Sequence, residues 1–248
     1  MLLTAADILQ SRLLPLKDMI LLDAGYDDTN GITQPEKRPI VESLRQAVVL
    51  LPVAFFEDFL RMAVEQFLDY INAKEPRICW AKLPLELRRT HVFDAPLLIS
   101  RKPPDGDDDN YQMRSLEQFR STFEKILSPM SAPDRYSIVT EAFTNTNSNP
   151  SSDTVKMMFK KIGIANVFTA SELITSLTAL NPIYSNETSI KIKLNAIVEM
   201  RHGVAHGRPA STLTRSELSD NMLFLEAFAQ GAQDTAEALL ERMSRQIP

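Results

Sequence analysis

The sequence is poor in cysteine and in glycine, and it has no long uninterrupted apolar run. Its single cysteine, Cys79, cannot form an internal disulfide, which favours a protein that works in a reducing compartment. The sequence contains no stretch of about 18 uninterrupted apolar residues, which a helix needs to cross a bilayer. Its first residues also lack the basic and apolar regions of a signal peptide. These absences predict a soluble, cytoplasmic protein that makes no contact with membranes.

Basic residues are not in excess. Lys and Arg number 27 against 32 Asp and Glu, which gives a net charge of −5. A protein that binds nucleic acid over its whole surface is usually basic. Any contact with RNA is therefore expected to be local. The acidic run at residues 105–110 is predicted to be a solvated loop, because it lacks the alternating ligands and the terminal Glu of a calcium-binding EF-hand.

Apolar residues make up 44% of the chain and recur mostly at helical spacing. This pattern predicts an all-α fold. The first helix is expected over residues 5–22 with an interruption at Pro15, followed by a loop over 23–39 and a long core helix over 40–71 that is kinked at Pro52. Later helices are expected at about 115–127, 133–143, 153–162, 171–180, 187–205 and 216–246. The last of them follows a capping-box pattern, Thr214 to Glu217.

The chain is expected to form one helical domain over residues 1–248. Residues 1–39 form its N-terminal helix and loop, and residues 40–72 its long core helix. Prolines interrupt residues 73–111, which are expected to be an irregular insertion between the central helices. Residues 112–248 form the helical remainder, in which residues 187–206 are the helix that carries the most informative motif.

That motif is the segment Arg201-His202-Gly203-Val204-Ala205-His206. Arg201 falls on an apolar stripe of its helix, so its charge has to meet a carboxylate, a phosphate or a subunit interface. His202 and His206 share a face one turn apart, and Gly207 can end the helix in a left-handed cap. A guanidinium grips phosphate oxygens and an imidazole moves protons near neutral pH. Together they could cleave an RNA phosphodiester without a metal.

Each of these residues also has a structural interpretation. Arg201 could pair with a core acid such as Glu57 or Asp58. His206 could simply bond the carbonyls at the helix end and interact with the helix dipole.

His202 and His206 have the spacing of two metal ligands, but a zinc site needs further ligands. His91 and Cys79 lie in the irregular region and show no ligand spacing. We therefore expect no metal and no other cofactor.

The segment Arg201–His206 resembles the Arg-polar-x3-His motif of the HEPN superfamily, with His202 at the polar position that is usually Asn. Two further segments resemble the RiboL-PSP-HEPN branch: Ala54–Leu60, with an acid at its centre, and Asn147–Val167. The resemblance covers roughly residues 40–245. It implies a HEPN-like helical bundle and a homodimer, in which motif residues of two protomers line one cleft and cleave RNA without a metal.

The resemblance also implies roles for individual residues. Arg201 and His206 are expected to be the catalytic pair, with His202 beside them as the polar residue. Glu57 and Asn195 are expected to support them. Apart from the resemblance, Lys156 and Lys160 share one helix face, which is either a solvated face or, together with Arg208, a contact for RNA phosphates.

The expected function is that of an endoribonuclease, a toxin or effector in a prokaryotic defence or RNA-repair-linked system. Its products would carry a 2′,3′-cyclic phosphate and a 5′-hydroxyl. An antitoxin or a regulatory protein is a candidate partner. The alternative is a catalytically inactive module of the same family that binds RNA or another protein.

Overall fold

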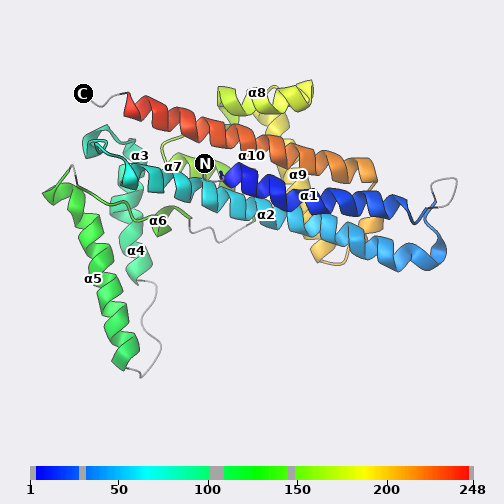
Figure 1. Cartoon of the computed structure of the whole chain (residues 1–248), viewed down its shortest axis with the longest axis horizontal. Coiled ribbons are helices and arrows are strands. Elements are labelled where there is room, and N and C mark those ends of the chain that lie inside the picture. The colour runs from blue at the N-terminus through cyan, green and yellow to red at the C-terminus, as the bar shows by residue number, and fades with distance from the viewer. Residues whose placement is uncertain (1–3, 28–31, 101–108, 134, 145–148, 246–248) are drawn as a thin grey trace. The chain divides into compact units, whose positions relative to one another are not determined.

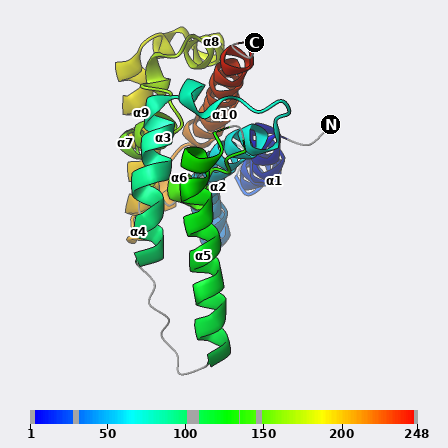
Figure 2. The ribbon, with the colours of Figure 1, turned by 90° about the vertical axis from the view of Figure 1, so that its left-hand side faces the viewer.

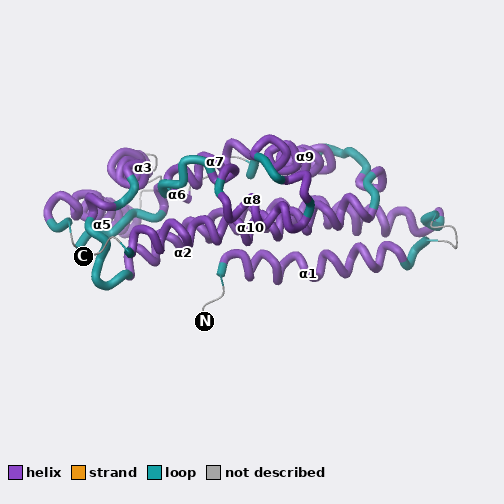
Figure 3. The backbone as a smooth tube through the Cα atoms, turned by 90° about the horizontal axis from the view of Figure 1, so that it is seen from above, coloured by secondary structure: helices purple, strands orange, loops and turns teal. Residues whose placement is uncertain are grey.

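The computed structural model describes residues 4–27, 32–100, 109–133, 135–144 and 149–245. Its secondary structure is helical, and the described residues contain no strand (Figure 3). The one β-type contact is an isolated bridge between Asp27 and Thr33. The predicted all-α class is confirmed. Among the residues described, no helix combines the length and the apolar character that crossing a bilayer requires.

The backbone divides into two compact units, which we describe separately. The first unit comprises Met1–Ala63, Ser148–Val155 and Val167–Thr235, and the second comprises Val64–Asn147, Lys156–Asn166 and Ala236–Pro248. Three helices begin in the first unit and end in the second: α2 (Arg38–Ala73), α7 (Ser152–Lys161) and α10 (Arg215–Ser244) (Figure 1). Because these helices are shared, the division does not by itself contradict the predicted single domain, which stays a prediction.

The first unit also contains α1 (Ala5–Ala24), α8 (Ser171–Leu180) and α9 (Glu187–Ala205). Short 3-10 turns complete it at Pro35–Lys37, Val167–Thr169, Pro182–Tyr184 and Ala210–Thr212. The bounds of α8 and α9 are those that the sequence predicts. α10 begins after the predicted capping box, in which the Thr214 N–H donates to Glu217 over 2.8 Å and the Glu217 N–H donates to the Thr214 hydroxyl over 3.2 Å.

Aromatic rings join the helices of the first unit. The ring of Phe56 on α2 packs edge-on against that of Phe228 on α10, with centroids 5.4 Å apart, and Phe168 packs against Phe228 at 5.8 Å. α8 approaches α10 at Gly231, where an added Cβ would lie 2.7 Å from the Cα of Leu173. A glycine is needed there because backbone occupies the space that a side chain would take.

The expected interruption of α1 at Pro15 is wrong, because the helix runs unbroken from Ala5 to Ala24. Pro15 is exposed, whereas Leu13 and Leu16 on either side are buried. Proline removes one backbone hydrogen bond from α1, and the burial of these two leucines offsets that loss, so the helix stays continuous. α2 likewise continues through Pro52.

The second unit is more regular than predicted. Residues 73–111 contain the 3-10 turn Trp80–Lys82, α3 (Leu85–Arg89), a π-helical turn (Thr90–Asp94), α4 (Ala95–Ser100) and the start of α5 (Asp109–Ser131). α4 and α5 lie side by side (Figure 2). Prolines occur in this region without breaking it, since Pro84 is the N-cap of α3 and Pro96 is the second residue of α4. A missing N–H costs little at a helix start such as that of α3, whereas Pro96 lies just after the π-helical turn Thr90–Asp94, where the α-helical hydrogen-bond pattern is already interrupted. The predicted acidic loop at residues 105–110 lies mostly outside the described residues.

The helix expected at residues 133–143 is also wrong, because only α6 (Glu141–Thr144) forms there. Side chains from elsewhere in the second unit bind the backbone instead. The N–H of Ile138 donates to Asn72 over 2.8 Å, and the N–H of Val139 donates to Nδ1 of His91 over 3.2 Å. His91 is buried, and burial lowers its pKa. Its environment is that of a structural residue.

Candidate functional site

The motif occupies the C-terminal turn of α9, and a Schellman cap ends that helix. The N–H of Gly207 donates to the carbonyl of Val204 over 3.1 Å, and the N–H of Arg208 donates to the carbonyl of Gly203 over 2.9 Å. Gly207 has φ 95°, a conformation that favours glycine. The predicted left-handed cap is therefore confirmed. It places His206 at the cap position and turns the chain away immediately afterwards.

His202 and His206 form an exposed pair of imidazoles. Their ring centroids are 4.3 Å apart with an interplanar angle of 60°, and both side chains are exposed. Two neighbouring imidazoles on a solvent-facing helix end can reach a bound substrate. One could accept a proton while the other donates one.

Arg201 points elsewhere and is half-buried. Its Nη1 donates to Oδ1 of Asn149 over 3.1 Å. An amide oxygen orients a guanidinium without cancelling its charge, whereas a carboxylate would neutralise it. The positive charge of Arg201 thus stays available to a phosphate. The sequence analysis included Asn149 in the family-like segment Asn147–Val167 but gave it no role beside Arg201.

The acids proposed as structural partners of Arg201 are paired with other arginines. Oε1 of Glu57 lies 2.5 Å from Nη2 of Arg61, one turn further along α2. Oδ2 of Asp58 accepts from Nη1 of Arg12 over 2.9 Å. The partner of Arg201 is therefore an amide, and a supporting role for Glu57 stays a prediction.

Asn195 acts on the same segment as Arg201. Its Oδ1 accepts from the backbone N–H of Ser152 over 2.9 Å, which caps the first turn of α7. Two side chains of α9, those of Asn195 and Arg201, thus hold the chain at residues 149–152 against this helix. The predicted supporting role of Asn195 in catalysis remains a prediction, and the structure assigns it this local contact.

A single protomer brings the two histidines together but not Arg201 with His206. Residues five apart on an α-helix are rotated by about 140° about its axis. The contacts agree with that rotation, since Arg201 meets Asn149 whereas His206 meets His202. Among the described residues, no hydrogen bond joins Arg201 to His206.

The basic residues predicted to bind RNA lie on different elements. Lys156 is half-buried and Lys160 is exposed, and both lie on the part of α7 that belongs to the second unit. Arg208 is exposed directly after the cap of α9 in the first unit. Its stem covers Gly203, where an added Cβ would lie 3.2 Å from Cδ of Arg208. Their contact with RNA stays a prediction. Within the described part of the chain, no three His, Cys, Asp or Glu side chains gather as metal ligands would.

One comparison with known proteins gives a match. A family model described as RiboL-PSP-HEPN matches residues 16–238, a span that includes α9 and the motif at its end. No curated protein and no solved structure matches the chain.

Proposed function

We propose that this chain, which belongs to the RiboL-PSP-HEPN family, is a metal-independent endoribonuclease that acts as a homodimer. The observation that carries the proposal is the complete motif at the end of α9. Its imidazoles are exposed side by side, and its guanidinium is held by a neutral amide. These groups are oriented, yet they have no carboxylate partner among the described residues.

The exposed face of α9 supports the dimer. Ile192, Ala196, Gly203 and His206 fall within about 80° of one another around the helix axis. The side chain of Ile192 on this face is 65% exposed and could be covered by a second helix. Ala196 is small and exposed and would let a second helix approach closely, whereas Gly203 is covered by the stem of Arg208. A copy of α9 packed here would bring the histidines of both protomers to one cleft.

The proposed reaction is a transesterification within the RNA. One imidazole removes the proton of a ribose 2′-hydroxyl, whose oxygen attacks the adjacent phosphorus. The bond from phosphorus to the 5′-oxygen breaks, and a protonated imidazole gives that oxygen its proton. The guanidinium of Arg201 stabilises the charge on the phosphorane. The products are a 2′,3′-cyclic phosphate and a 5′-hydroxyl, so protons and electrons balance within the substrate and the two imidazoles.

The biological setting that we propose rests on the family alone. It is a toxin or effector role in a prokaryotic defence or RNA-repair-linked system, held in check by an antitoxin or a regulatory protein. The second candidate is an inactive module that binds RNA or a protein partner, which the net charge of −5 favours.

Cleavage of total RNA and of defined oligoribonucleotides in EDTA tests the proposal. Replacing the base or acid should slow cleavage by about 10²- to 10⁴-fold, so His206→Ala should be nearly inactive. His202→Asn places the usual family residue at that position and should keep more activity than His202→Ala. If wild-type protein cleaves none of these RNAs, the nuclease proposal fails and the binding module remains.

The dimer is tested separately by sedimentation with matched variants. Ile192→Glu should weaken self-association and slow cleavage, because it places a charge in the proposed interface. Ile183→Glu is the control, since Ile183 is 62% exposed but lies on the 3-10 turn before α9. Co-expressed Arg201→Ala and His206→Ala chains should recover activity in mixed dimers if one site draws on both protomers. A fully active monomer would exclude the composite site.

A further inference from the structure

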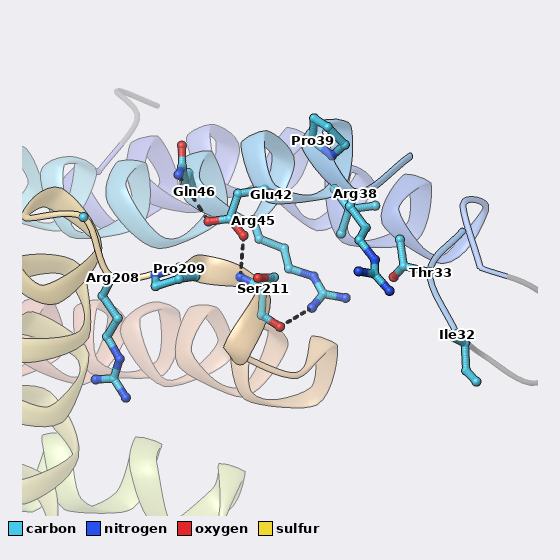
Figure 4. A pocket seen from close by; sticks show the side chains of 12 residues that line it. Ile32, Thr33, Arg38, Pro39, Glu42, Arg45, Gln46, Arg208, Pro209 and Ser211 are labelled. Carbon is cyan, nitrogen blue, oxygen red and sulfur yellow. Dashed lines mark hydrogen bonds between the residues drawn. The ribbon is translucent and has the colours of Figure 1, made fainter. Parts of the chain in front are cut away.

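An unassigned pocket opens beside the end of α9 in the first unit (Figure 4). Its volume is about 700 Å³, within the range of about 300–1,000 Å³ that is typical of ligand sites. Its walls come from three segments: residues 32–33, the first turns of α2, and residues 207–211 after the cap of α9. The pocket therefore begins at Gly207, immediately after the motif.

Two guanidinium groups of this pocket have no partner within the described part of the chain. Arg38 and Arg208 are exposed, and neither side chain has a hydrogen bond or an ion pair among the described residues. Figure 4 shows them at opposite ends of the pocket, extending to the same side. A planar guanidinium without a carboxylate binds phosphate oxygens in a two-pronged manner. The pair therefore provides two phosphate contacts.

The other charged groups of the pocket are committed to building its wall. Nε of Arg45 donates to Oδ2 of Asp23 over 2.9 Å, and Asp23 is 1% exposed. The carboxylate of Glu42 accepts from the backbone N–H groups of Ala210 over 2.6 Å and Ser211 over 2.8 Å. These bonds fix residues 210–211 against α2. Asp23 pairs the charge of Arg45, whereas the N–H groups hold the carboxylate of Glu42 in place without cancelling its charge, and the charges of Arg38 and Arg208 have no partner among the described residues.

The remaining lining is mixed, with the polar residues Thr33, Gln46 and Ser211 beside an apolar part. Ile32, Pro39, Val41 and Pro209 all contribute to the wall, and the side chain of Ile32 is 60% exposed. A wall of this kind suits a planar ring, while guanidinium groups at either end suit charged groups attached to it. A nucleotide combines both features. Inorganic phosphate would use only the arginines.

The position of Arg208 links this pocket to the motif. Its stem lies over Gly203, and a Cβ on that glycine would be 4.0 Å from Nη1 of Arg208. Gly203 and His206 are three residues apart and so are neighbours on the surface of α9. A strand bound at the imidazoles can therefore continue past Arg208 into the pocket.

We propose that this pocket binds a nucleotide of the RNA strand next to the bond that is cleaved, with Arg38 and Arg208 on its phosphates. This assignment rests on the proposed ribonuclease function and adds a substrate-binding subsite to it. Arg38 and Arg208 are 170 residues apart in the sequence, and only the fold brings them to one pocket.

Two separate assays, one of RNA binding and one of RNA cleavage, test the proposed subsite. The probe for binding is a fluorescent oligoribonucleotide with 2′-O-methyl groups, which cannot be cleaved by this chemistry. Arg38→Ala and Arg208→Ala should each weaken binding about tenfold or more at low salt. Each should also reduce the slope of log K against log salt concentration by about 0.7, the value for one phosphate contact with a single strand.

The control is Arg135→Ala, which removes an equal charge. Arg135 is exposed, and its side chain has no partner among the described residues. This variant should bind as wild type does.

The outcomes separate the two proposals. If wild type cleaves RNA but the Arg38 and Arg208 variants bind like the control, the subsite is overturned and the nuclease stands. If wild type cleaves nothing but binding depends on both arginines, RNA binding at the pocket is supported and the nuclease fails. A nucleoside monophosphate is titrated in parallel. If it binds with dependence on both arginines while RNA binding does not depend on them, the pocket takes a free nucleotide and the assignment to the RNA strand is overturned.

Discussion

Replacing Asn149 by Asp should raise stability and lower RNA cleavage at the same time. The exchange is nearly isosteric, and it turns a hydrogen bond of 3.1 Å between Arg201 and an amide into an ion pair. In the folded protein the new carboxylate attracts the guanidinium that already faces it. In the proposed reaction that same attraction competes with the phosphorane for Arg201.

The magnitude follows from Coulomb's law. Two unit charges about 4 Å apart attract by about 4 kcal/mol at an effective dielectric constant near 20. Arg201 is only half-buried, so water screens much of this, and we expect a gain of about 1 kcal/mol in the free energy of unfolding. The activation free energy of cleavage should rise by more than the free energy of unfolding does, because the charge of Arg201 acts on the phosphorane in a cleft that the substrate closes to water. About 1.4 kcal/mol or more corresponds to cleavage slowed roughly tenfold or more.

Urea denaturation measures the first quantity and single-turnover cleavage the second. Asn149→Ala is the control, since it removes the orienting oxygen without adding charge, and both stability and cleavage should then fall. The reasoning is refuted if Asn149→Asp cleaves RNA at the wild-type rate, or if it is destabilised as much as Asn149→Ala.

Three further predictions concern the scaffold. Asp23→Ala should lower the free energy of unfolding by about 3–5 kcal/mol in urea denaturation, because Asp23 is 1% exposed and removing it leaves Arg45 without its carboxylate; a change below about 1 kcal/mol would contradict this. Burial lowers the pKa of His91, so the unfolded chain binds more protons and the free energy of unfolding should fall as the pH drops below about 6.5. His91→Gln should lose less stability than wild type between about pH 6.5 and 5.5, and equal losses would rule out this source. Gly207→Ala should cost about 1 kcal/mol from backbone conformation alone, because φ is 95° and nothing lies within 4 Å of an added Cβ; an unchanged melting temperature would show that the cap tolerates a side chain.

Features set by neighbouring residues could be predicted from the sequence. α9 has its predicted bounds because it combines an apolar period with strong signals at its ends. α8 also has its predicted bounds, although its N-cap Ala170 makes no side-chain hydrogen bond. Asn186 accepts from the N–H of Ser189 at the start of α9, and Gly207 closes its end. The motif position follows from these local signals, and a pattern of a few residues is enough to recognise it.

Features that depend on distant residues could not be predicted in this way. Asn149 lies 52 residues before Arg201, and an amide in a polar run gives no sign of its partner. Residues 136–139 are not helical although their pattern is locally helical, because Asn72 and His91 bind the backbone N–H groups of Ile138 and Val139. The pocket has the same origin, since its arginines come from opposite ends of the first unit's sequence.

The acidic composition is compatible with RNA binding because the pairing of charges is selective. A phosphate responds mainly to charges within a Debye length, about 8 Å at physiological salt, and not to the net charge of −5. In the first unit, Glu57 and Asp58 are paired with arginines of the scaffold, while Glu42 is bound to backbone N–H groups. Three arginines of the same unit have no carboxylate partner among the described residues: Arg38, Arg201 and Arg208. A chain with more acids than bases can thus keep local positive charge at the motif and in the pocket beside it, because several of its carboxylates serve the fold.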